Sequence, residues 1–198
     1  MTIEPSIPPP GGIVIGASMG AIEALSEILP VLPEGYPLPV LVVVHVARDR
    51  KSGLPELFAN RCRIPVKEAE DKEPIQGGVI YFAPPDYHLL VENDFSLSLS
   101  NEEPVLYSRP AIDVLFDSAA DAYGDRLVGI VLTGASTDGA KGLRAICLAG
   151  GKALVQDPET AAGQTMPLAA LDLCPDARSL RLDEIAAILS ADIVDILK

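Results

Sequence analysis

The sequence of 198 residues contains no tryptophan, few aromatic residues and only three cysteines. Aromatic side chains make up 5% of the chain and hydrophobic ones 48%, so the core must consist mainly of valine, isoleucine, leucine and alanine. This composition is typical of a buried parallel sheet covered by helices. Cys62, Cys147 and Cys174 form no C-x-x-C pair, which excludes the common zinc-binding patterns, and their odd number favours free thiols in a reducing compartment.

Positive charge is also scarce. The chain has 15 lysine and arginine residues against 28 aspartate and glutamate residues, so its formal net charge is −13. Such a chain repels phosphate backbones and anionic lipids, and its one basic cluster, residues 48–51, is short and interrupted by Asp49. The sequence has neither a secretory signal pattern at its start nor a run of about 18 apolar residues. We therefore expect a cytoplasmic protein that neither binds nucleic acid nor inserts into a membrane.

The chain is expected to form one domain after a short arm. Residues 1–11 are rich in proline and lack apolar periodicity, which predicts a flexible arm, and residues 12–198 have a normal size for a single domain. Within this domain, short apolar segments alternate with segments whose apolar residues recur at helical spacing. The predicted strands are 12–15, 40–44, 64–68, 127–132 and 152–156, and the predicted helices are 21–29, 54–61, 111–123 and 141–149.

An antiparallel insertion is predicted at residues 79–100, where three short apolar segments, 79–83, 88–92 and 95–100, are separated by turns. Since strands that alternate with helices favour right-handed crossovers, the predicted fold is α/β. It is a doubly wound, mainly parallel sheet with helices on both faces and an inserted antiparallel hairpin. Residues 158–167 are expected to form a loop. The last helix is expected to be capped by Asp183 and to bury Ile185, Ile188, Leu189, Ile193 and Ile196.

Polar residues follow three of the predicted strands at the point where each strand ends. Gly16-Ala17-Ser18-Met19-Gly20 follows the first strand, His45 follows the second, and residues 134–139, which include Asp138, follow the third. In open parallel sheets, ligands bind beyond the carboxyl ends of the strands. We therefore expect Ser18, His45 and Asp138 to lie on one rim of the sheet.

The segment around Ser18 matches the pattern G-x-S-x-G. Its glycines allow a sharp turn from strand to helix that exposes the serine hydroxyl, and the backbone N–H of Met19 would then face a developing oxyanion. This pattern favours a nucleophilic serine. Two other interpretations stay open, because a small-residue turn can follow a strand without any chemistry or can bind an anion through its free amides.

His45 is the expected base for Ser18, since histidine ordinarily titrates near neutrality, and Asp138 is expected to orient it. His45 equally fits a structural histidine at a strand end, and Asp138 equally fits an N-cap of the helix that follows it. For His88, in the predicted hairpin turn, a structural role is favoured. Arg109 fits either a clamp for a carboxylate beside the scissile ester or an ion pair.

Six short motifs follow one another along the chain, and in this order they are specific although each alone is weak. They are Gly16-Ala17-Ser18, His45 after a valine run, residues 109–116, residues 132–140, Gln156-Asp157 and Met166-Pro167. In these motifs the sequence resembles the catalytic domain of the chemotaxis protein-glutamate methylesterases, from about residue 12 to residue 173.

This resemblance implies a parallel α/β catalytic domain in residues 12–198 that hydrolyses γ-glutamyl methyl esters on the cytoplasmic helices of methyl-accepting chemoreceptors. It implies that Ser18 is the nucleophile, His45 the base and Asp138 the residue that orients the base, with no metal and no organic cofactor. Some family members also deamidate receptor glutamines. Family members commonly carry a receiver domain ahead of the catalytic domain, and here only the proline-rich arm precedes it. A separate response regulator is therefore a second candidate partner, after the chemoreceptor helices.

The chain departs from the family beside the nucleophile. Met19, Gly20 and Ala21 stand where the family usually has threonine or serine followed by two glycines, and Ala135 stands where it usually has methionine. We expect the backbone N–H groups of Met19 and Ala135 to serve the oxyanion whatever their side chains are. The departures leave open a catalytically silent scaffold that binds a signalling partner. The turn after the first strand also leaves open a phosphate-binding or nucleotide-binding module.

Overall fold

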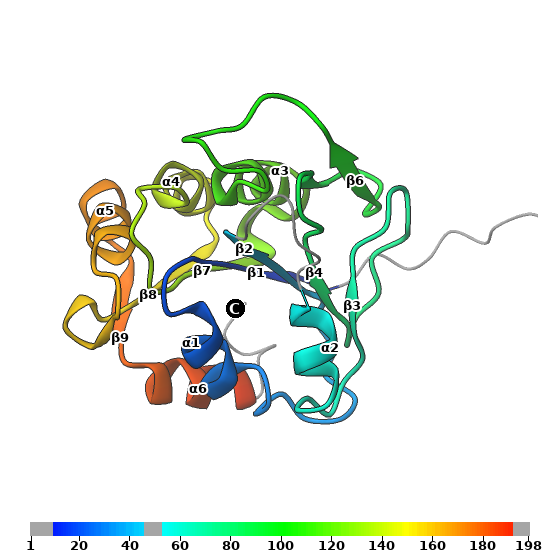
Figure 1. Cartoon of the computed structure of the whole chain (residues 1–198), viewed down its shortest axis with the longest axis horizontal. Helices are drawn as coiled ribbons and strands as arrows, with labels where there is room; N and C mark the ends of the chain where they lie inside the picture. Colours follow the sequence, from blue (N-terminus) through cyan, green and yellow to red (C-terminus); the bar gives the residue numbers. More distant parts are fainter. Residues whose placement is uncertain (1–9, 46–52, 192–198) are drawn as a thin grey trace, which may run out of the picture.

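A seven-stranded parallel sheet with helices on both faces forms the centre of the computed structural model, which describes residues 10–45 and 53–191 (Figure 1). The predicted doubly wound α/β fold is confirmed, and a separate antiparallel hairpin packs beside the sheet. The basic cluster at residues 48–51, nearly all of the predicted arm, and Ile193 and Ile196 lie outside the described residues. No helix within the described ranges is long and apolar enough to span a membrane.

The strands are β1 (Gly12–Ala17), β2 (Val40–Val44), β3 (Val66–Glu68), β4 (Ile80–Phe82), β5 (His88–Val91), β6 (Leu97–Ser100), β7 (Leu127–Val131), β8 (Lys152–Gln156) and β9 (Arg178–Leu180). The helices are α1 (Ala21–Ile28), α2 (Leu54–Ala59), α3 (Ile112–Tyr123), α4 (Ala140–Leu148), α5 (Thr165–Leu173) and α6 (Leu182–Ser190). Two short 3-10 helices are η1 (Gly124–Arg126) and η2 (Pro158–Thr160).

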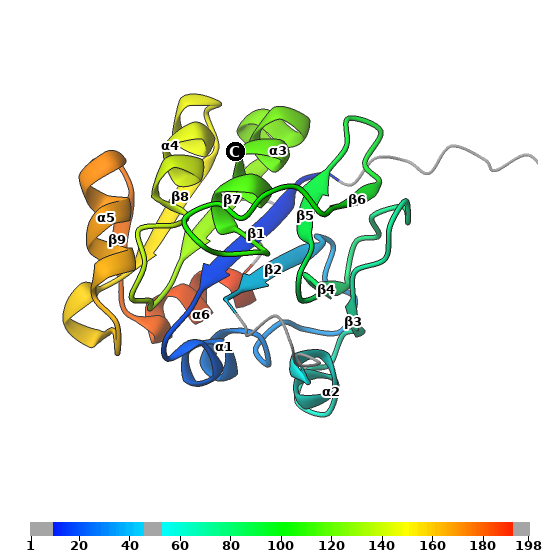
Figure 2. The same cartoon turned by 45° about the horizontal axis from the view of Figure 1, so that its top comes forward.

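The strand order is β3-β4-β2-β1-β7-β8-β9, so the chain builds outward from β1 on one side and then returns to β7 on the other. Figure 2 shows β1, β2 and β7 side by side. Near their carboxyl ends Ala17 pairs with Val44 and Gly16 pairs with Val131. A reversal of strand order leaves a crevice beyond the carboxyl ends of the strands. The segments that follow these three strands therefore share one rim.

Two helical layers cover the sheet, with α1, α2 and α6 on one face and α3, α4 and α5 on the other (Figure 1). Because side chains alternate along a strand, Ile13 and Ile15 of β1 pack into the first layer and Val14 packs into the second. Every residue of β1, β2 and β7 is buried, as central parallel strands require. The sheet thus gives the rim a rigid base.

The close contact between α3 and α4 depends on Gly142. A Cβ atom at this position would lie 2.4 Å from Cβ of Phe116 and 3.1 Å from Cα of Asp113. We expect Gly142→Ala to lower the free energy of unfolding by about 1–3 kcal/mol, because the added methyl group forces the two helices apart. A helical glycine replaced by alanine ordinarily gains about 0.5–1 kcal/mol, so the expected sign is unusual.

Urea unfolding followed by circular dichroism measures this change in stability. Lys141→Ala, on the exposed side of α4, is the matched control and should leave the unfolding midpoint almost unchanged. A Gly142→Ala variant as stable as the wild-type chain would contradict the close approach of the two helices.

The antiparallel insertion is shorter than predicted, because within residues 79–100 the strands that pair with each other in this way are β5 and β6. The segment predicted as its first strand forms β4, which instead lies parallel between β2 and β3 in the main sheet. All three residues of β4 are buried, and both faces of the sheet are covered at this point. A three-residue strand carries too short a pattern to distinguish a parallel neighbour from an antiparallel one.

The carboxyl-terminal third of the chain contains two elements that the sequence pattern did not predict, α5 and β9. The predicted loop at residues 158–167 ends in the first turn of α5, where Pro167 needs no amide partner and is compatible with a helix. The predicted cap of the last helix was wrong. Arg181 is the N-cap of α6, and Asp183 lies in the first turn, where it accepts from Arg181 Nε at 3.1 Å.

Cys147 and Cys174 form a disulfide, so the prediction of three free thiols was wrong. Cys62 is the free cysteine. The bonded cysteines are 27 residues apart in the sequence, but they lie at the carboxyl ends of α4 and α5, with their Cα atoms 6.9 Å apart. The pairing follows from how the two helices pack, which the spacing of cysteines in the sequence does not reveal.

Candidate active site

Ser18 and His45 directly follow neighbouring strands. Ala17 of β1 pairs with Val44 of β2, and the backbone N–H of His45 donates to the carbonyl of Ala17 at 3.1 Å. Neighbouring strands lie about 4.8 Å apart, so residues that follow a register pair are close neighbours. Between these two described residues no hydrogen bond joins the Ser18 hydroxyl to the imidazole. Such catalytic contacts often tighten only when substrate binds.

His45 and Asp138 are joined by a hydrogen bond of 2.7 Å between Nε2 and Oδ2. The imidazole is 13% exposed, whereas the carboxylate is completely buried. An ionised carboxylate can only accept, so the imidazole proton lies on Nε2 and Nδ1 carries the lone pair. This tautomer has the form that a general base requires.

Asp138 also caps a helix, but a different helix from the one predicted. Its Oδ2 accepts from the N–H of Ile112 at 2.7 Å and its Oδ1 accepts from the N–H of Asp113 at 2.9 Å, at the start of α3. The N-cap of α4 is Gly139, with φ at 94°, so the interpretation of Asp138 as a cap of the helix that follows it was wrong. Because helix N-termini favour negative charge, α3 stabilises this carboxylate.

Asp113 is a second buried carboxylate beside Asp138. Its Oδ1 accepts from the N–H of Gly139 at 2.9 Å and from the N–H of Gly142 at 2.8 Å. Burial raises the pKa of Asp113, and the charge of Asp138 raises it further, although the two amide bonds act in the opposite direction. Sequence reasoning did not identify Asp113 as a functional residue. The available signals were its place in the motif at residues 109–116, which carried the family resemblance, and in the first turn of a predicted helix.

The raised pKa of Asp113 predicts a stability that falls as pH rises. The folded chain holds this proton to a higher pH than the unfolded chain, in which aspartate titrates near pH 3.9. Between the two pKa values the folded state binds more protons, so the free energy of unfolding decreases with increasing pH. The Asp113→Asn variant has no carboxyl group at this position, so its stability lacks this dependence on pH. Its stability relative to the wild-type chain should therefore increase as the pH rises above about 4, the range in which unfolded aspartate has lost its proton.

Urea unfolding of both proteins at a series of pH values measures this stability difference. Asp121→Asn, two turns further along α3 and exposed, is the control for the loss of a carboxylate. If the free energy of unfolding of Asp113→Asn fell relative to that of the wild-type chain as the pH rises, the prediction of a raised pKa at Asp113 would be wrong.

The turns that carry the predicted oxyanion donors are anchored to Thr133. The carbonyl of Thr133 accepts from the N–H of Ser18 at 2.9 Å, and its hydroxyl donates to the carbonyl of Met19 at 2.8 Å. The N–H of Ser18 is therefore already engaged. In contrast, the N–H groups of Met19 and Ala135 donate to no other group within the described part of the chain, and both residues are exposed. These two amides remain the candidates for an oxyanion hole.

Thr133 and Gln156 organise the rim, although sequence reasoning assigned them no role. Gln156 is 2% exposed, and its Oε1 accepts from the N–H of Thr133 at 2.9 Å. The N–H of Gly163 donates to the Thr133 hydroxyl at 2.8 Å, and the N–H of Gly134 donates to the carbonyl of Gly163 at 2.9 Å. The loop before α5 is thereby fixed against the rim. Both residues belong to motifs that carried the family resemblance, which was the available signal.

Arg109 lies in an ion pair. Its Nε and one terminal nitrogen donate to Oδ1 of Asp86 at 3.0 and 2.7 Å, and its other terminal nitrogen donates to the carbonyls of Asn101 and Glu102. Of the two roles predicted for Arg109, the structure contains the ion pair. A contact between Arg109 and a substrate carboxylate stays a prediction.

His88 is buried and connects the hairpin to the start of α3. Its Nδ1 accepts from the N–H of Ala111 at 3.1 Å, and its Nε2 lies 3.2 Å from the carbonyl oxygen of Glu103. Both ring nitrogens are therefore engaged with the backbone. This is the structural role that the sequence favoured.

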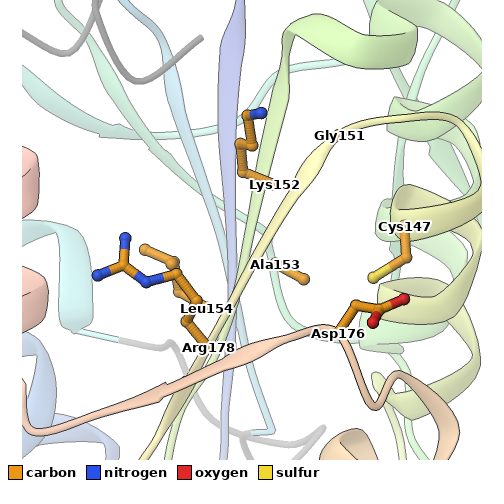
Figure 3. A pocket seen from close by; sticks show the side chains of 7 residues that line it. All are labelled: Cys147, Gly151, Lys152, Ala153, Leu154, Asp176 and Arg178. Atoms are coloured by element: carbon orange, nitrogen blue, oxygen red, sulfur yellow. The ribbon is translucent and has the colours of Figure 1, made fainter. Parts of the chain in front are cut away.

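A pocket opens at the other end of the sheet, beside the amino end of β8 (Figure 3). Figure 3 shows Lys152 and Arg178 on one side of β8, and Cys147 and Asp176 on the other. Lys152 is the first residue of β8, so the pocket lies away from the carboxyl ends of the strands. It is therefore separate from the rim that carries Ser18.

The chain matches the family model described as CheB methylesterase over residues 13–189. A protein of Leptospira interrogans, provisionally named protein-glutamate methylesterase/protein-glutamine glutaminase, is 45% identical over 174 residues, 88% of this chain and 90% of that protein. The protein-glutamate methylesterase/protein-glutamine glutaminase 1 of Carboxydothermus hydrogenoformans is 38% identical over 91% of this chain and 55% of that protein. The protein-glutamate methylesterase/protein-glutamine glutaminase 2 of Anaeromyxobacter dehalogenans is 42% identical over 87% of this chain and 50% of that protein.

The chain thus spans most of the Leptospira relative and about half the length of the other two. The structure is also similar to the crystal structure of the Thermotoga maritima CheB methylesterase catalytic domain, with a TM-score of 0.87 and 30% sequence identity. That similarity covers 94% of this chain and 98% of the Thermotoga chain. Family model, sequence relatives and fold agree over nearly the whole described chain, and the protein belongs to the CheB methylesterase family.

Proposed function

We propose that this chain is a serine hydrolase that cleaves γ-glutamyl methyl esters on the cytoplasmic helices of chemoreceptors and releases methanol. The names of its relatives support this class of substrate. One observation carries the chemistry, namely the hydrogen bond between His45 and the buried Asp138 on the rim that also carries Ser18. A serine beside an oriented imidazole is the arrangement used by nucleophilic hydrolases.

The proposed reaction proceeds through an ester of Ser18. As the Ser18 oxygen attacks the substrate carbonyl, His45 Nδ1 takes the hydroxyl proton and then gives it to the departing methanol. Water, activated by the same nitrogen, hydrolyses the glutamyl-serine ester and restores the hydroxyl. Asp138 stabilises the imidazolium that forms in both steps, and the amides of α3 hold Asp138 in place.

The N–H groups of Met19 and Ala135 are the proposed donors to the oxyanion of each tetrahedral intermediate. Their lack of partners within the described residues and their exposure at the rim support this role. A single such donor contributes about 10²–10³-fold to kcat in other serine hydrolases. The departures at positions 19 and 135 change side chains and not these amides, so the proposal does not depend on the family's usual residues there.

We extend the proposal to receptor glutamines, because the names of the relatives also contain protein-glutamine glutaminase. The same steps hydrolyse an amide when ammonia leaves in place of methanol. Ammonia is a poorer leaving group, so protonation by His45 matters more in this reaction. Parallel assays of methanol and ammonia on one receptor fragment measure the two activities separately.

The proposed partners follow from the proposed substrate. The methyl esters lie on cytoplasmic helices, so we propose that the chain acts in the cytoplasm and that residues 12–198 form the catalytic domain. A separate response regulator stays a predicted second partner. Co-purification with a receptor cytoplasmic fragment, compared between methylated and unmethylated forms, tests the first of these contacts.

The experiment that tests the function is methanol release from a methylated receptor fragment, incubated with the whole chain. We expect methanol in proportion to the methyl esters lost, and labelling of Ser18 by a fluorophosphonate. A chain that binds the fragment but releases no methanol and resists the probe would be a silent scaffold. Calorimetric binding of nucleotides without ester turnover would instead indicate the phosphate-binding module, which the family match does not favour.

A further inference from the structure

At the N-termini of α3 and α4, the backbone amides of each helix donate to an aspartate at the start of the other helix. Asp138 precedes α4 but accepts from the amides of Ile112 and Asp113 at the start of α3. Asp113 lies in the first turn of α3 but accepts from the amides of Gly139 and Gly142 at the start of α4. Each helix therefore binds the acidic side chain of the other, and the two residues are linked directly because the N–H of Asp113 donates to Asp138.

These reciprocal hydrogen bonds hold the turn that carries Asp138 in place. Gly139 directly follows Asp138, and its amide is bound by Asp113 Oδ1 at 2.9 Å. The same oxygen binds Gly142 at 2.8 Å, one turn into α4. Gly142 has no Cβ, which lets α4 approach the backbone of α3 at Asp113. A displacement of the Asp113 oxygen would therefore move the Asp138 carboxylate together with its turn.

The position of Asp138 in turn determines the direction of the His45 hydrogen bond. Asp138 Oδ2 accepts from both Ile112 and His45 Nε2, each at 2.7 Å, so the carboxylate has little freedom to rotate. Asp113 is 6% exposed, and water cannot readily replace its oxygen as an acceptor for the two glycine amides. Catalysis is sensitive to such geometry, since misplacement by about 1 Å can cost about 10²-fold in rate.

We propose that Asp113 is a positioning residue, which holds the turn of Asp138 through Gly139 and Gly142 and so aligns Asp138 with His45. The inference rests on the proposed function in one respect, that Ser18, His45 and Asp138 act as a triad. It adds a fourth side chain, which acts through its Oδ1 as an acceptor and not through its charge.

Two variants separate the acceptor from the charge. Asp113→Asn removes the charge but keeps an oxygen at the Oδ1 position, so we expect kcat near the wild-type value. Asp113→Glu keeps the charge but moves the carboxylate by one methylene. We therefore expect its kcat to fall about 10-fold to 100-fold with KM nearly unchanged, because alignment and not substrate binding is lost. Asp113→Ala, which removes the acceptor, should match Asp113→Glu or fall below it.

The measurements are kcat and KM for methanol release and the rate of fluorophosphonate labelling of Ser18, each on variants whose circular dichroism matches that of the wild-type chain. Asp121→Asn and Asp121→Glu, on the exposed side of α3, are the matched controls. The order wild type, Asn, then Glu supports the proposal. The reverse order, with Glu active and Asn impaired, overturns it, and so do equal rates in all variants.

The labelling rate keeps this test separate from the test of substrate class. The probe needs only an activated serine, so the Asn and Glu variants can be compared even if the wild-type chain releases no methanol. In that case the missing methanol would overturn the proposed substrate alone. If Asp113→Ala does not fold, the comparison of Asn with Glu still decides the proposal.

Discussion

Replacing Ser18 with alanine should lower kcat for methanol release by up to about 10⁶-fold, as loss of the nucleophile does in other serine hydrolases. The reason is that this variant lacks the hydroxyl that forms the covalent ester, whereas binding of the receptor fragment needs only the rim and should persist. KM should therefore change far less than kcat. Methanol release from a methylated receptor fragment under saturating conditions measures the loss.

A matched control for Ser18→Ala is Ser190→Ala. Ser190 is an exposed serine at the end of α6 whose hydroxyl donates to the carbonyl of Ala187. This variant should keep wild-type kcat and should still react with a fluorophosphonate at Ser18. Near-normal turnover by Ser18→Ala would refute the assignment of the nucleophile.

Replacing Asp138 with asparagine should lower kcat by about 10⁴-fold, as the corresponding change does in a serine protease. The carboxylate of Asp138 accepts three hydrogen bonds, from the N–H groups of Ile112 and Asp113 and from His45 Nε2, and it donates none. An asparagine must place its NH₂ group at one of these two oxygen positions. A donor would then face a donor, and His45 would lose its acceptor or α3 would lose an amide partner.

The same change should also destabilise the fold. An unsatisfied buried donor costs about 1–3 kcal/mol, so Asp138→Asn should lower the free energy of unfolding by about that amount. Enzyme assays and urea unfolding on one preparation measure both effects, with Asp121→Asn as the control. Wild-type kcat in a folded Asp138→Asn variant would mean that His45 does not depend on this carboxylate.

The fold was largely predictable because burial leaves a direct mark on the sequence. The apolar run at residues 40–44 has no polar alternation, and β2 is buried along its whole length. The errors fall where the pattern is short. Residues 80–82 form a strand as predicted, but the pattern of three residues does not show whether the neighbouring strand runs parallel or antiparallel. The start of α5 was missed because Pro167 suggested a loop, whereas a proline in the first turn does not break a helix.

The candidate site was predictable in part for the same reason. Ser18 and His45 lie where two buried strands end, and parallel strands bring their carboxyl ends to one edge. The partner of Arg109 could not be predicted in this way. The position of Arg109 before a helix did not reveal Asp86 as its partner, because the two residues belong to segments that meet only after the hairpin has packed.

The sequence by itself determined most of the strands and helices up to β8 and which polar residues stand at the ends of buried strands, since burial leaves periodic, local patterns. Only the tertiary structure decided which groups meet. It joined Asp138 to α3 and Asp113 to α4, and it joined Cys147 to Cys174. Hydrogen bonds and disulfides are directional and short, so they depend on how closely two helices approach and at what angle. No pattern within a single segment contains that information.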